Sequence, residues 1–118
     1  MSTRETIDHY FKALESRGAW QDAFSEDVRF TSFISPVREM NGRDAFVEGT
    51  KRFYGSIESV EVRELLVDGD RAVALTRYVI RRLGDKPGFR SDVAEVFRVR
   101  DSRIVSFGIY FDTAPYPK

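Results

Sequence analysis

Cysteine is absent from this 118-residue chain, and histidine occurs only once. Without cysteine the protein has no disulfide, no thiolate metal ligand and no cysteine nucleophile. A metal site would have to be built from carboxylates, and the acidic residues show no clustered spacing of that kind. We therefore expect no metal and no other cofactor, and His9 is interpreted as a solvated surface residue.

An excess of charge of either sign is also missing. The 19 basic and 19 acidic residues cancel, so the chain lacks the positive surface typical of proteins that bind nucleic acid or anionic membranes. No apolar run approaches the roughly 20 residues of a membrane-spanning helix, and the N-terminus lacks the apolar core of a secretion signal. The sequence therefore predicts one cytoplasmic domain over residues 1–118, with no nucleic-acid or membrane partner.

The chain begins with a pattern typical of a capped helix. Ser2 and Glu5 have the spacing of a capping box, in which each side chain satisfies a backbone N–H at the helix start. Apolar residues then recur three and four positions apart, as on one buried face of a helix. These residues are Ile7, Tyr10, Phe11 and Leu14. Gly18 is expected to end the helix.

A mixed region follows the first helix. We expect a short helix over residues 20–24 and a strand over residues 28–33. A loop then leads to a helix over residues 43–54, with Asn41 as its N-cap and Gly55 at its end.

From residue 57 onward the pattern is that of strands joined by tight turns. Asp68-Gly69 predicts a hairpin turn, followed by a long strand over residues 71–83. Residues 89–113 form two alternating runs that meet at Asp101-Ser102, which predicts a second hairpin. Helices on one face of a mostly antiparallel sheet make an α+β fold.

Three segments carry a family resemblance: AWQDAFSEDVRFTSF, NGRDAFVEGTKRFY and SRIVSFGIYFD. They resemble the SnoaL-like members of the nuclear transport factor two-like superfamily, and the resemblance covers nearly the whole chain. It implies a cone-shaped, curved, mostly antiparallel sheet wrapped around a long N-terminal helix, with two further helices. It also implies a central pocket for a small apolar molecule and a dimer through the outer sheet face.

The steroid isomerases of this superfamily suggest site residues. Their oxyanion-binding tyrosine and acid fall on Tyr10 and Glu95, which interrupts an otherwise apolar strand face. Their general base falls on Ser32, and a serine hydroxyl cannot abstract a carbon-bound proton near pH 7. Their supporting tyrosine falls on Thr50 or, with a gap, on Tyr54.

The limonene epoxide hydrolases, also similar, use two aspartates bridged by an arginine. Their arginine falls on Arg77, but their aspartates fall on Val79 and Ile109, so this chemistry is not expected. If Arg77 faces Glu95, the carboxylate is paired and stays ionised; if Glu95 is alone in an apolar pocket, its pKa is raised and it can donate a proton. The sequence leaves both interpretations open.

The candidate catalytic residues are therefore Tyr10, Arg77 and Glu95. The candidate pocket wall consists of Trp20, Ser32, Phe33, Tyr54, Phe97, Phe107 and Ile109.

Apolar residues occupy both faces of the later strands. We expect Glu95 on the face under the helices, and Tyr78, Ile80, Ala94 and Val96 on the opposite, outer face. An apolar outer face needs cover, which predicts a homodimer through it.

Two function classes follow. The first is an isomerase, cyclase or dehydratase that uses oxyanion or acid–base chemistry on a compact apolar carbonyl substrate. The second is a non-catalytic ligand-binding or protein-interaction dimer module of the same fold. The fold does not choose between them, because this scaffold carries many functions.

Overall fold

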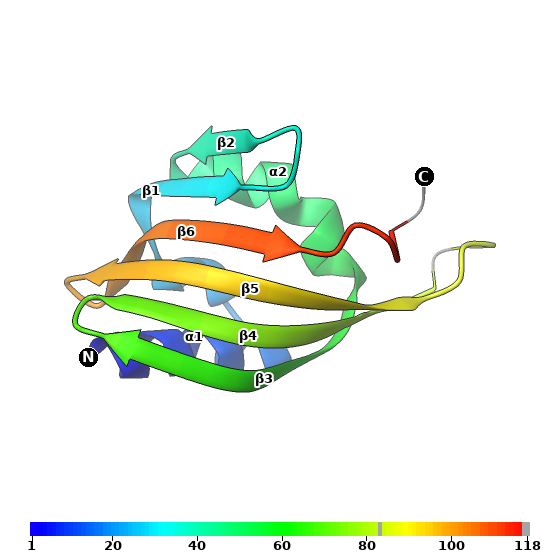
Figure 1. Ribbon diagram of the computed structural model, residues 1–118. Helices are drawn as coiled ribbons and strands as arrows, with labels where there is room; N and C mark the ends of the chain where they lie inside the picture. The colour runs from blue at the N-terminus through cyan, green and yellow to red at the C-terminus, as the bar shows by residue number, and fades with distance from the viewer. Residues whose placement is uncertain (83, 117–118) are drawn as a thin grey trace.

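A computed structural model describes residues 1–82 and 84–116, shown in Figure 1. The helices are α1 (Thr3–Glu15), the 3₁₀ helix η1 (Trp20–Ala23) and α2 (Arg43–Ser56). The strands are β1 (Phe24–Ser32), β2 (Arg38–Asn41), β3 (Ile57–Asp68), β4 (Arg71–Ile80), β5 (Phe89–Arg100) and β6 (Arg103–Phe111).

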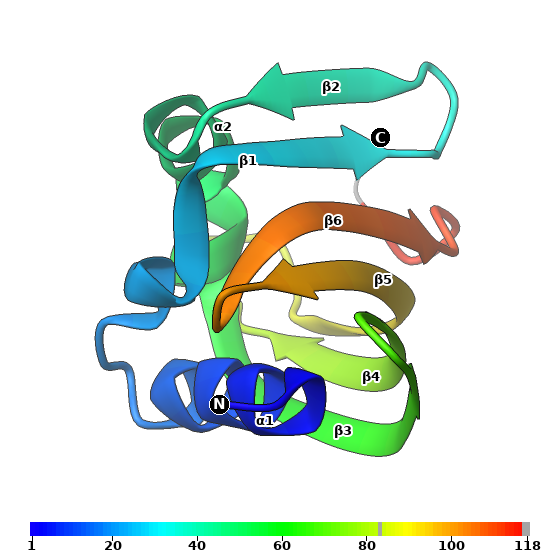
Figure 2. The same ribbon diagram turned by 90° about the vertical axis from the view of Figure 1, so that its left-hand side faces the viewer.

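The six strands form a single sheet in the order β2-β1-β6-β5-β4-β3. Within the described residues, β1 and β6 are the only parallel neighbours, and the other pairs are antiparallel. The sheet is curved, and α1 and α2 both lie on its concave side (Figures 1 and 2). This arrangement confirms the predicted α+β class and the curved, mostly antiparallel sheet around the N-terminal helix.

The start of α1 is fixed by local hydrogen bonds. The Ser2 hydroxyl accepts from the Glu5 backbone N–H at 3.1 Å, and the Glu5 carboxylate accepts from the Ser2 N–H at 2.9 Å, so the predicted capping box is present. The predicted apolar stripe is buried against the sheet. The helix ends at Glu15, and Arg17 rather than Gly18 has the left-handed conformation, with φ 58°.

The largest error of the sequence prediction is β2, which was expected to be loop. Asn41, the predicted N-cap, is the last residue of β2 and pairs with Arg29 of β1. Gly42, with φ 94°, stands at the N-cap of α2 without a side-chain cap. A four-residue strand gives no clear alternation, because its pairing with β1 rather than its own pattern defines it.

Three boundaries also differ. The strand β1 begins at Phe24, because Phe24 already pairs with Ile104 of β6. The helix α2 continues past Gly55 to Ser56 and runs directly into β3. The strand β4 ends at Ile80, and Leu83, its predicted last residue, lies outside the described residues.

The assignment of Tyr78 and Ile80 to the outer face is wrong. Both are buried on the concave side, at 2% and 5% exposure, whereas Leu75 is 37% exposed on the outer side. Both faces of this strand are apolar, so alternation alone could not decide which one the helices cover. Val96 is exposed as expected.

The helices divide the concave side between them. α1 packs against β3, β4, β5 and β6, while α2 packs against β1 and β2. An aromatic cluster fills the space that they share, with Tyr10, Phe24, Phe46 and Phe107 at its centre. Among the described residues, no helix is both long enough and apolar enough to cross a membrane.

Candidate functional site

A cavity of about 320 Å³ opens on the concave side of the sheet, next to α2. Its wall is mostly aromatic and aliphatic, a composition typical of sites for small apolar ligands. The lining residues come from β1, β2, α2, β4, β5, β6 and the C-terminal segment. They are Phe30, Ser32, Arg38, Met40, Phe46, Gly49, Thr50, Phe53, Tyr54, Tyr78, Val93, Glu95, Phe107, Ile109, Phe111 and Tyr116.

Glu95 is the one carboxylate among these lining residues, and its side chain is 1% exposed. Two hydroxyl groups of β4 hold it: Thr76 Oγ1 donates to Glu95 Oε2 at 2.6 Å, and the Tyr78 OH donates to the same oxygen at 2.8 Å. The other oxygen, Oε1, accepts no hydrogen bond from the described residues. No polar side-chain atom of these residues is both fully enclosed and without a partner, so Oε1 is not fully enclosed. Oε1 is therefore the oxygen that remains accessible from the cavity.

The surroundings of Glu95 tune its acidity. Burial raises the pKa of the carboxyl to about 7, although the hydrogen bonds from Thr76 and Tyr78 act to lower it. An ordinary glutamate titrates near pH 4.3 and is ionised at neutrality. Glu95 is thus poised to both accept and release a proton near pH 7, which is the condition for efficient general acid–base catalysis.

A pair of tyrosines lies in the same region. The hydroxyls of Tyr10 and Tyr54 are 2.7 Å apart, and the Tyr54 ring stacks on Trp20 at 3.8 Å between ring centroids. Tyr54 lines the cavity, whereas Tyr10 is fully buried behind it. The expected order is reversed: Tyr54 faces the cavity, and Tyr10 supports it.

Both tyrosines stay protonated at neutral pH. Burial raises the pKa of the Tyr10 and Tyr54 phenols well above the ordinary value, and the nearby Glu95 raises both further. If Tyr10 donates to the Tyr54 oxygen, the Tyr54 OH is free to donate to a ligand.

Arg77 does not contact Glu95, which rules out the interpretation in which the two residues form a pair. Its guanidinium binds Asp92 in a bidentate manner, with Nε to Oδ1 at 2.7 Å and Nη2 to Oδ2 at 3.3 Å. Thr76 and Tyr78, its neighbours in β4, point to the concave side, so Arg77 points to the outer side. The interpretation with Glu95 alone in an apolar pocket is the one that the structure supports.

The seven residues predicted for the pocket wall lie at three different places in the structure. Ser32, Tyr54, Phe107 and Ile109 line the cavity. Two others stand one layer behind it: Trp20 lies behind Tyr54, and Phe97 stacks on Phe107 at 4.9 Å.

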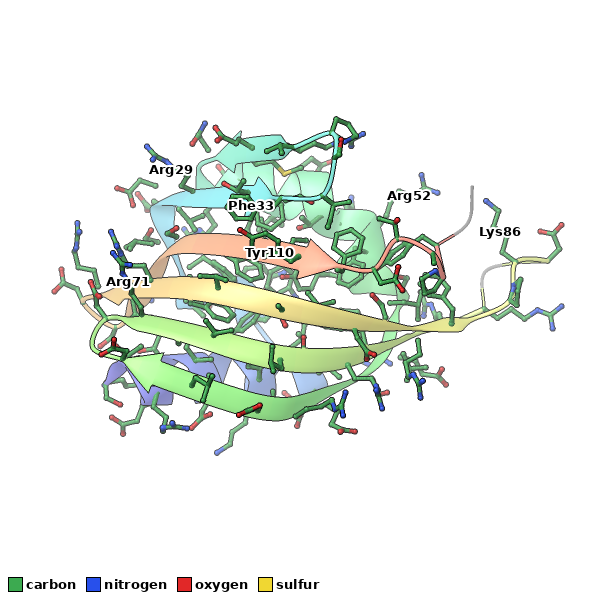
Figure 3. All side chains as sticks on the ribbon, viewed as in Figure 1. Arg29, Phe33, Arg52, Arg71, Lys86 and Tyr110 are labelled. Atoms are coloured by element: carbon green, nitrogen blue, oxygen red, sulfur yellow. The ribbon has the colours of Figure 1, made fainter. Side chains whose placement is uncertain are left out.

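Phe33 is the exception, because it lies outside the cavity altogether. It is 43% exposed on the outer face, and its ring stacks on that of Tyr110 with 4.6 Å between the centroids. Figure 3 shows these two labelled side chains next to each other. Phe33 directly follows Ser32, so the alternation of side chains puts the two residues on opposite faces.

Several lining residues were missed in the sequence analysis. Arg38 and Met40 would have followed from recognising β2, because they pair with Ser32 and Phe30 of β1. Tyr78 was assigned to the wrong face. Tyr116 comes from the C-terminal segment, where its OH lies 2.8 Å from Ser91 Oγ, and no local pattern indicates this contact.

Carboxylates and histidine are not grouped for metal binding. Within residues 1–82 and 84–116, no three His, Cys, Asp or Glu side chains lie close enough together to hold an ion. The polar groups that line the cavity are the Glu95 carboxyl, the Arg38 guanidinium and several hydroxyls.

The same fold occurs in many solved structures. A nuclear transport factor two-like protein from Burkholderia thailandensis is 19% identical, with a TM-score of 0.81 and coverage of 96% of this chain and 92% of that one. A putative isomerase from Bacillus subtilis is 17% identical, with a TM-score of 0.81 and coverage of 96% and 88%. A putative SnoaL-like polyketide cyclase from a Jannaschia species is 17% identical, with a TM-score of 0.76 and coverage of 98% and 93%.

These identities are low enough that the likenesses establish the fold alone. No functionally curated protein matches the sequence. The family itself is established by a different comparison, because the model of the SnoaL-like domain matches residues 7–107, which include most of the lining residues. The chain therefore belongs to the SnoaL-like domain family, within the nuclear transport factor two-like fold.

Proposed function

We propose that this protein is a cofactor-independent acid–base enzyme that moves a proton on a compact apolar carbonyl compound. The observation that carries the proposal is Glu95, a buried carboxyl group with a pKa of about 7 and one oxygen accessible from a mostly apolar cavity. The solved structures with the same fold include a putative isomerase and a putative polyketide cyclase, which supports an acid–base enzyme.

The residues divide the chemistry between them. Ionised Glu95 accepts a proton from the carbon next to the substrate carbonyl, through Oε1, and the carbonyl becomes an enolate. The Tyr54 OH donates a hydrogen bond to the enolate oxygen, and Tyr10 orients Tyr54. Where the substrate has a C=C bond conjugated with the enolate, Glu95 then returns the proton to the far carbon of that bond, which moves the double bond and completes an isomerisation with no net change in protonation. Return to the original carbon gives proton exchange alone.

A non-catalytic binding pocket is the second candidate. The observation in its favour is Ser32, which stands at the position of the general base of the steroid isomerases and lines the cavity. Glu95 would then only bind the ligand. A neighbour with a ketosteroid isomerase-like fold, from Catenulispora acidiphila, was solved in complex with trimethylamine.

Deuterium exchange at the carbon next to a ketone distinguishes these candidates. Wild-type protein in D₂O is expected to accelerate exchange into one- and two-ring ketones, followed by NMR. Glu95→Gln is expected to lower the rate by about 10²–10⁴-fold, because it removes the one carboxylate among the described residues that line the cavity. Tyr54→Phe should lower it more than Tyr10→Phe, since Tyr54 lines the cavity.

Asp92→Asn is the matched control, because Asp92 is a carboxylate of the same strand on the outer face. It should leave exchange unchanged. Ligand binding without any exchange in the wild type would favour the non-catalytic candidate.

We also propose that the outer face forms a homodimer. Phe33, Leu75, Val96 and Tyr110 are exposed there, at 37–48%, and an apolar patch of this kind is typical of an interface. Light scattering at micromolar concentration is expected to give twice the chain mass, and Tyr110→Asp to give a monomer. A wild-type monomer would refute the proposed dimer.

The cytoplasmic location remains a prediction.

A further inference from the structure

Arg38 is the one basic side chain among the described residues that line the cavity. It pairs with Ser32 across β1 and β2, so both side chains lie on the same, concave side of the sheet. Unlike Glu95, Arg38 is exposed to solvent. A residue that both lines a cavity and is exposed stands at its mouth, so the cavity has a carboxyl group inside and a guanidinium at its opening.

The guanidinium of Arg38 makes no ion pair or hydrogen bond with the described part of the chain. Other arginines do have such partners: Arg43 lies near Glu26 and donates to the Phe24 carbonyl, and Arg77 binds Asp92. The planar N–H donors of Arg38 are thus available to a ligand, and their geometry matches the two oxygens of a carboxylate.

The positions of the two charges also select how a ligand enters. An anionic group next to Glu95 would be desolvated by the aromatic wall and repelled by the ionised carboxylate. The same group at the mouth stays hydrated and is attracted by Arg38. An anionic ligand therefore has one favourable orientation, with its uncharged end inside.

We propose that the substrate is a carbonyl compound with an apolar body and one carboxylate at its outer end, the carboxylate bound by Arg38 and the carbonyl placed between Glu95 and Tyr54. This inference rests on the proposed function, because it names the class of substrate for the same site. Arg38 acts on binding and orientation only, and the proton transfer remains with Glu95.

Matched probes test it. The probes are 4-oxocyclohexanecarboxylate and 3-(4-oxocyclohexyl)propanoate, each compared with its own methyl ester, by calorimetry and by exchange in D₂O. We expect at least one acid to bind about ten-fold more tightly than its ester at low salt, and this preference to shrink in 0.5 M NaCl as exposed charges are screened. Arg38→Gln should remove the preference, so that each acid binds about as well as its own ester.

Two further variants separate the charge of Arg38 from the geometry of its donors and provide a control. Arg38→Lys keeps the charge without the planar donors, so it should retain only part of the preference. Arg29→Gln is the matched control, because Arg29 is an exposed arginine of the adjacent strand β1 and, next to inward-facing Phe30, points to the outer side.

The outcomes separate the two proposals. Equal binding of acids and esters, or an acid preference that survives Arg38→Gln, overturns the role of Arg38. If Glu95→Gln still abolishes exchange in that case, the proposed function stands. If neither acids nor esters bind or exchange, the proposed function fails, and this inference fails with it.

Discussion

Folding stability is expected to fall by about 3 kcal/mol between pH 4.5 and pH 8 through Glu95 alone, and Glu95→Gln is expected to abolish this loss. The pKa of the carboxyl is about 7 in the folded protein, against a reference value of 4.5. One pKa unit corresponds to about 1.4 kcal/mol of difference between folded and unfolded states.

The sign follows from which state binds the proton more tightly. A raised pKa means that the folded protein holds the Glu95 proton at a pH where the unfolded chain has lost it. The stabilisation is therefore complete below pH 4.5 and is lost as the pH rises through 7. In Glu95→Gln the amide oxygen can still accept from Thr76 and Tyr78, and its NH₂ group takes the place of Oε1 toward the cavity.

Urea denaturation of both proteins at intervals from pH 4.5 to pH 8 measures this loss as the difference between wild type and variant, so the titrations that the two proteins share cancel. The variant should be the more stable protein at pH 8. Asp92→Asn provides the control, because hydrogen bonding to Arg77 lowers the pKa of that exposed carboxyl instead. Parallel pH profiles for wild type and Glu95→Gln would contradict the raised pKa.

The same measurement also tests the alternative in which Glu95 is paired with Arg77, which the sequence left open. Had Arg77 faced Glu95, the pKa of the carboxyl would be lowered, and stability would rise with pH over the acidic range. Glu95→Gln would then destabilise the protein, because a buried guanidinium would lose its partner. Arg77 instead contacts Asp92 on the outer side, so Arg77→Met is expected to have little effect on stability.

The sequence predicted those features that depend on neighbouring residues. The capping box at Ser2 and Glu5 and the hairpin turn at Asp101-Ser102 are local, and both are present. Glu95 could be identified as unusual because it was a single charge in an apolar alternation. The family resemblance then supplied the curved sheet.

Features that depend on how segments pair and pack against one another were predicted poorly. β2 exists because Ser32 and Arg38 pair, and its four residues show no pattern of their own. The face of β4 that points inward was predicted wrongly, because it is set by the side of the sheet that the helices cover. The order of Tyr10 and Tyr54 is a matter of depth: both hydroxyls meet, but only Tyr54 reaches the cavity. Periodicity reports a direction and not a depth.

Phe107→Ala is expected to destabilise the protein by about 3–5 kcal/mol, the usual cost of removing a buried phenylalanine ring. Phe107 is 3% exposed, and its ring centroid lies 4.9–6.4 Å from those of five other aromatic residues. These are Tyr10, Phe24, Phe30, Phe46 and Phe97. The ring belongs to the core and to the cavity wall at once.

Phe111→Ala is the matched comparison, because Phe111 lies on the same strand and lines the same cavity but is only partly buried. Its removal should cost about 1 kcal/mol, since fewer of its contacts are lost. Urea denaturation at pH 6 measures both variants. Equal losses would show that Phe107 contributes no more to the core than a residue at the cavity mouth.

The space left by Phe107→Ala joins the cavity, and this has a consequence for ligands. A two-ring ketone that fills the enlarged cavity should raise the midpoint of denaturation more in Phe107→Ala than in wild type, because binding to the folded state alone stabilises it. A one-ring ketone should show the opposite order, since it leaves part of the space empty. If neither ketone distinguishes the variant from wild type, the ring of Phe107 does not limit the size of the ligand.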